Sequence, residues 1–128
     1  MSPPLLSQAQ FAGVLRDLCV SDEMALDIEA AGGVDAVIEA ARRHYGSADV
    51  QAAAAGALRN LSELDQIADQ IAVRGGIEIL VDATARHPDD QYVAARVAGA
   101  LWGLSVHDQI AEVIGTSGGM DALINAAK

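Results

Sequence analysis

The sequence predicts an all-helical solenoid, in which repeated helical units stack into an elongated domain. The first indication is a spacing of 43 residues, at which the pairs Gly32-Gly33, Gly75-Gly76 and Gly118-Gly119 recur. In the same register, residues 28–70 and 71–113 are identical at 18 of 43 positions without a gap. The composition is 52% hydrophobic but only 3% aromatic, which indicates closely packed aliphatic helices, and Ala and Leu favour helix.

The repeat register divides the chain into units that we expect to form one domain over residues 1–128. The units are a lone third helix at 7–21, repeats at 22–64 and 65–107, and a partial repeat at 108–128 that lacks its third helix. The array therefore holds about three repeats and is out of frame at both ends. Each solenoid unit covers only its neighbours, so about three units is the practical minimum for a stable core.

Each unit is expected to contain three helices. The first is short and begins at an aspartate, Asp65 in the central unit, whose carboxylate we expect to cap the free amides of the first turn. It ends at the Gly-Gly pair, where a positive φ angle would turn the chain sharply. The second helix, near 34–44 and 77–87, carries apolar residues at helical spacing and ends at His44 or His87.

The third helix of each unit runs to Ser62 or Ser105. Start signals precede it, namely Ser47 or Asp49 in one unit and Pro88-Asp89-Asp90 in the next. A glycine recurs in its middle, at Gly56 and Gly99. Because glycine costs roughly 1 kcal/mol relative to alanine inside a helix, its return predicts that another backbone comes close there.

These features together resemble the armadillo repeat. The stretches that carry the resemblance are EAAGGVDAVIEA, VRGGIEILVDA, SGGMDALINA, AAAAGALRNLS and AARVAGALWGLS, and the resemblance as a whole extends over almost the entire chain. HEAT repeats fit less well because they usually lack this Gly-Gly turn, and tetratricopeptide repeats fit less well because their units are shorter. The resemblance implies a right-handed superhelix whose third helices line a concave groove. It also implies a non-catalytic scaffold that binds a segment of a protein or peptide partner along that groove.

Armadillo proteins of the importin-alpha and beta-catenin branches clamp a peptide backbone with a ladder of asparagines on the third helices. In this chain the ladder position holds Asn60 in one unit, Gly103 in the next and Asp17 in the partial first one. The tryptophan position of those branches holds Gly13, Gly56 or Gly99. The chain therefore resembles divergent armadillo scaffolds more than receptors for basic nuclear-import signals.

The candidate binding residues lie on the predicted third helices. Asn60 offers a donor and an acceptor to a ligand backbone, although a helix-end residue can also be satisfied locally. Trp102 is the only tryptophan and either forms an interaction hot spot or packs against the next unit. The remaining candidates are Arg59, Glu63, Tyr92 and Arg96. These residues either line the groove or form a solvated rim.

The residue types present argue against several classes of function. A net charge of −10 would repel nucleic-acid phosphates, and neither a long apolar run nor a secretory signal is found, so a cytoplasmic protein that binds no membrane is expected. Equivalent residues such as His44 and His87 would be too far apart to share a metal ion. Cys19 lies at a predicted helix end. We therefore expect no enzyme, cofactor or metal site.

Both ends of the array are expected to expose apolar residues, because neither carries a polar capping repeat. This predicts an alternative function, in which the chain is a self-assembling unit that forms a head-to-tail or exchanged oligomer. A fragment of a longer array is the other interpretation of the same pattern. The residues of the proposed self-association edge are Phe11, Val14, Leu15, Leu18, Met120, Leu123 and Ile124.

Overall fold

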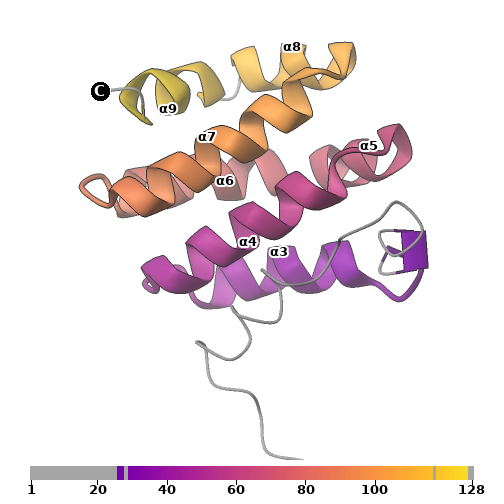
Figure 1. Cartoon of the computed structure of the whole chain (residues 1–128), viewed down its shortest axis with the longest axis horizontal. Coiled ribbons are helices and arrows are strands. Elements are labelled where there is room, and N and C mark those ends of the chain that lie inside the picture. The colour runs from indigo at the N-terminus through magenta and orange to yellow at the C-terminus, as the bar shows by residue number, and fades with distance from the viewer. Residues whose placement is uncertain (1–25, 28, 117, 127–128) are drawn as a thin grey trace, which may run out of the picture.

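A computed structural model describes residues 26–27, 29–116 and 118–126, and this part of the chain is helical without any strand. The prediction of an all-α fold is confirmed. The described helices pack against one another (Figure 1). They are α3 (Gly33–Arg43), α4 (Ala48–Leu61), α5 (Asp65–Val73), α6 (Gly76–Arg86), α7 (Gln91–Ser105), α8 (Asp108–Thr116) and α9 (Gly119–Ala126).

The helix starts follow the spacing of the sequence. The starts of α3, α6 and α9 lie 43 residues apart, at Gly33, Gly76 and Gly119. The same spacing separates α4 from α7 and α5 from α8. Figure 1 shows α4 and α7 side by side, with α3 next to α4, and with α8 and α9 across α7 from it. Among the described helices, α4 and α7 make the most extensive contact.

An aliphatic core holds the helices together. Its members come from α3 through α8 and form one continuous cluster, with Leu58, Ile67 and Leu101 fully buried. Burying a side chain of this size stabilises the fold by about 1.5–3 kcal/mol relative to leaving it exposed. A core without large rings agrees with the low aromatic content, and it lets the helices approach closely.

In each Gly-Gly turn the two glycines are required for different reasons. The first glycine has the predicted positive φ, 89° at Gly75. The second glycine is required for space, because a Cβ at Gly76 would overlap Ile71 Cγ2 and lie 2.9 Å from the Ile71 carbonyl oxygen. The same pair of requirements returns at Gly118 and Gly119.

Side-chain caps begin both of the long helices, as the start signals predicted. The Ser47 hydroxyl accepts from Val50 N at 3.3 Å at the start of α4. Asp90 Oδ1 accepts from the backbone N–H groups of Tyr92 and Val93, both at 3.0 Å, at the start of α7. These bonds satisfy amides that have no partner inside the helix.

We expect Asp90→Ala to lower the free energy of unfolding by about 1 kcal/mol, because it leaves two first-turn amides of α7 without their acceptor. Urea denaturation followed by circular dichroism measures the loss. Asp89→Ala is the matched control, since Asp89 is exposed and outside the helix, and it should change stability by less than about 0.5 kcal/mol. Equal losses in the two variants would refute the capping role.

The predicted cap at Asp65 is wrong. Leu64 is the residue before α5 and Asp65 is its first helical residue, so the Asp65 carboxylate makes no capping hydrogen bond. It lies instead 2.7 Å from His107 Nδ1, while His107 Nε2 lies 2.9 Å from the carbonyl oxygen of Ser62. His107 therefore joins the loop before α8 to the loop before α5, a role that the sequence did not indicate.

Other polar contacts join neighbouring units. His87 Nε2 lies 2.9 Å from the Tyr45 carbonyl oxygen, and the guanidinium of Arg86 lies 4.2 Å from the centre of the Tyr45 ring. Arg74 pairs with Asp35 at 2.9 Å. No helix in the part of the chain that the structure describes is both long enough and apolar enough to cross a membrane.

Candidate functional site

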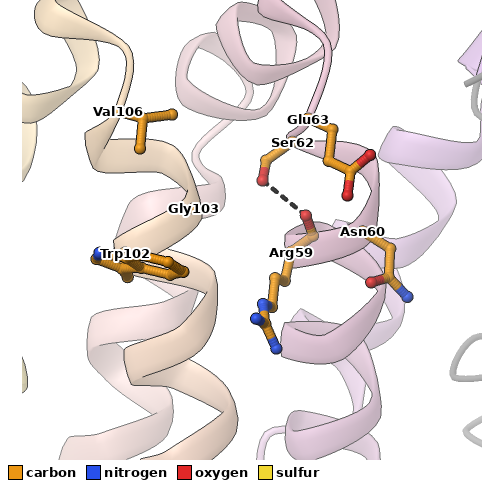
Figure 2. A pocket seen from close by; sticks show the side chains of 7 residues that line it. All are labelled: Arg59, Asn60, Ser62, Glu63, Trp102, Gly103 and Val106. Atoms are coloured by element: carbon orange, nitrogen blue, oxygen red, sulfur yellow. Dashed lines mark hydrogen bonds between the residues drawn. The ribbon is translucent and has the colours of Figure 1, made fainter.

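The candidate site is an open hollow between the C-terminal halves of α4 and α7. It has a volume of about 490 Å³ (Figure 2). Four of the sequence-predicted binding residues meet there. Three come from the end of α4 and the turn after it, and Trp102 comes from α7. The lining residues are Arg59, Asn60, Ser62, Glu63, Trp102, Gly103 and Val106.

Two serines at equivalent positions end the helices that form the hollow. The Ser62 hydroxyl donates to the Arg59 carbonyl oxygen at 2.7 Å, and the Ser105 hydroxyl donates to the Trp102 carbonyl oxygen at the same distance. A hydroxyl in this place satisfies a carbonyl that the end of the helix leaves open. The repeated Ser therefore fixes the helix ends that carry Arg59 and Trp102.

The mid-helix glycines have a different neighbour from the one predicted. A Cβ at Gly99 would lie 3.4 Å from Arg59 Cδ, and a Cβ at Gly56 would lie 3.4 Å from Arg96 Nη1. The glycines thus make room for arginine side chains and not for another backbone. Gly103 is tighter, because its Cβ would lie 3.0 Å from Ser62 Oγ and 3.7 Å from Arg59 Cγ.

Trp102 is exposed, with 64% of its surface accessible. The interpretation that it packs against the next unit is therefore wrong for the described residues. Val106, the C-cap residue that follows α7, is 66% exposed and was not predicted as a site residue. Its spacing of four residues from Trp102 was the available signal, since residues so spaced share one helix face.

Asn60 and Glu63 lie on the α4 side of the hollow. Figure 2 shows the Asn60 amide pointing away from α7, at the outer edge of the site. No hydrogen bond joins the Asn60 side chain to another described residue, so the structure gives no support for local satisfaction at the helix end. Both side chains are exposed, which leaves an amide and a carboxylate open to a ligand.

Tyr92 and Arg96 do not line the hollow. They lie in the N-terminal half of α7 and pair with each other, with Arg96 Nη2 donating to the Tyr92 hydroxyl at 2.7 Å. The Arg96 guanidinium also lies 4.9 Å from the centre of the Tyr92 ring. The sequence therefore placed these two residues on the right helix, but the structure satisfies them locally.

The predicted self-association edge is described only in part. Met120 and Ile124 are exposed on α9, at 54% and 53% of their surface. Leu123 belongs to α9, and its side chain lies outside the description. The remaining edge residues, Phe11, Val14, Leu15 and Leu18, lie outside the described residues, as do Gly13, Asp17 and Cys19.

The hollow combines a cation, an amide, a carboxylate and two exposed apolar side chains on a rigid pair of helices. Such a mixture suits a peptide, whose backbone and side chains offer matching donors, acceptors and apolar surface. No protein-family model, curated protein or solved structure matches the chain.

Proposed function

We propose that the chain is an armadillo-type interaction module that binds an extended segment of a partner protein across α4 and α7. The observation that carries this proposal is Trp102, which is exposed beside a hollow lined by Arg59, Asn60 and Glu63. Tryptophan and arginine are enriched among the residues that dominate binding energy at protein interfaces. Catalysis plays no part in this function.

The rigidity of the two helices supports the proposal. Behind the hollow, Leu58, Leu61, Leu101 and Leu104 are buried in the core, so α4 and α7 are fixed relative to each other. A rigid pair of helices presents its side chains without a cost in backbone ordering when a ligand binds. The armadillo assignment draws on the same helices, because units of one short and two longer helices with Gly-Gly turns repeat at 43 residues.

A selection from a random library of short linear peptides displayed on phage tests the proposal. We expect the full chain to enrich peptides that change the fluorescence of Trp102, because this single indole reports directly on the hollow. Binding should saturate with one peptide for each chain. Enriched peptides that leave the emission of Trp102 unchanged would place their site elsewhere and contradict the proposal.

A second candidate function is self-association through α9. One period earlier, Ile77 holds the position of Met120 and is completely buried, whereas Met120 is more than half exposed. Two exposed large apolar side chains on one short helix favour coverage by another helix. We propose a second copy of the chain as the covering partner, in a head-to-tail contact or in an exchanged dimer.

We expect the molar mass from light scattering to fall toward that of one chain on dilution through the micromolar range. Ile124→Asp should favour the single chain at every concentration, because it places a charge on the exposed apolar surface of α9 that the second copy would cover. Val73→Asp is the control, since Val73 is 80% exposed on α5. A mass of one chain at all concentrations would refute self-association, and it would leave the groove proposal unaffected.

A further inference from the structure

Arg59 differs from the other arginines that the structure describes. Each of the others has an acidic, carbonyl or aromatic partner, whereas the Arg59 guanidinium has no ion pair, hydrogen bond or ring contact with any described residue. The partnered arginines are Arg42 and Arg43 with Glu39, Arg74 with Glu29 and Asp35, Arg86 with Tyr45, and Arg96 with Tyr92. In a chain with 18 acidic and 8 basic residues, an unpaired cation is unexpected.

The Arg59 side chain is nevertheless well positioned. Its Cδ, Nε and Nη1 atoms all lie within 3.7 Å of the position that a Cβ at Gly99 would occupy. Its Cγ lies 3.7 Å from the position that a Cβ at Gly103 would occupy. The two glycines therefore form a shallow channel on α7 in which the arginine stem rests. Figure 2 shows Arg59 extending from α4 into the space between the two helices. The residue is exposed, and because its stem rests on α7 the side chain is partly preorganised for a ligand.

We infer that the hollow selects a partner segment with a carboxylate side chain that binds Arg59 and an apolar side chain that packs on Trp102 and Val106. This inference rests on the proposed function. Guanidinium groups prefer planar anions, and the pair with a carboxylate forms two parallel hydrogen bonds. Glu63, in the turn that follows α4, bears a negative charge that disfavours further acidic residues in the segment.

The repeat geometry sets the spacing within the segment. Arg59 and Trp102 are 43 residues apart and thus occupy equivalent positions on α4 and α7. Packed helices lie about 8–10 Å apart. A segment in the polyproline II conformation advances about 3.1 Å per residue and returns to the same face at every third residue. A segment that crosses both helices should therefore carry its acidic and apolar residues about three positions apart.

The test is a phage-displayed library of short random peptides, selected against the full chain and against single variants. The wild-type chain should enrich Asp or Glu about three residues from an aromatic or large aliphatic residue. Arg59→Gln should lower the affinity for the enriched peptide about tenfold. Arg59→Glu should instead enrich peptides that carry Lys or Arg at the acidic position. Arg43→Gln removes the same charge from α3, where the side chain is 73% exposed, and should keep the wild-type preference.

The outcomes separate this inference from the proposed function. Peptides that need Trp102 but show no acidic preference would overturn the carboxylate inference and leave groove binding in place. Equal losses for Arg59→Gln and Arg43→Gln would also overturn it, because net charge would then explain both. A chain that enriches no peptide would contradict both proposals. Thermal melts of each variant verify that folding is unchanged.

Discussion

Gly76→Ala is expected to lower the free energy of unfolding by about 2–3 kcal/mol. The added methyl group would overlap Ile71 Cγ2 and lie 2.9 Å from the Ile71 carbonyl oxygen. Ile71 is completely buried in the core, and the carbonyl belongs to α5, so neither atom can move without disturbing the helix pair. Urea denaturation measures the loss.

Gly46→Ala is the matched control for this substitution. A Cβ at Gly46 would meet nothing within 4 Å, and its φ angle is not in the left-handed region. The change should be neutral or should stabilise the chain by about 0.4–1 kcal/mol, because alanine restricts the unfolded chain. If Gly76→Ala unfolds at the same urea concentration as wild type, the close contact between α5 and α6 is wrong.

Trp102→Ala is expected to weaken the binding of a selected peptide by about thirtyfold, which corresponds to roughly 2 kcal/mol for an interface hot spot. Stability should change by less than about 0.5 kcal/mol, because the indole is mostly exposed and supports no core contact. Isothermal titration calorimetry is the suitable measurement, since the variant has lost its only tryptophan.

Val73→Ala provides the control for the loss of exposed apolar surface. Val73 is 80% exposed at the end of α5, and it does not line the hollow between α4 and α7. Its affinity for the same peptide should equal that of wild type. Trp102→Ala with unchanged affinity would show that the peptide binds outside the hollow.

Most of the helix pattern could be predicted because it depends on local signals that repeat. The Gly-Gly pairs and the caps at Ser47 and Asp90 each act within one turn of the chain, and the 43-residue spacing repeats the glycine pairs along the chain. The structure therefore places the helices close to their predicted positions. The handedness of the stack and its armadillo assignment are not tested by these local features and stay predictions.

The contacts between units were harder to predict because they depend on the relative position and orientation of neighbouring helices. Gly99 reads as a site of close backbone approach, yet Arg59 occupies that space, and no sequence rule distinguishes the two. His107 differs from its equivalent, Leu64, so the repeat gave no signal for its contact with Asp65. The sequence is compatible with both packing and exposure of Trp102, because only the tertiary arrangement decides between them.

The most direct test of groove binding is amide chemical-shift mapping by NMR, with the full chain and a peptide enriched from the random library. We predict that the perturbed amides cluster at the C-terminal ends of α4 and α7, including Asn60, Glu63, Gly103 and Val106. Perturbations centred on α3, α6 or α9, with these four amides unchanged, would contradict the proposal that the hollow between α4 and α7 binds the partner.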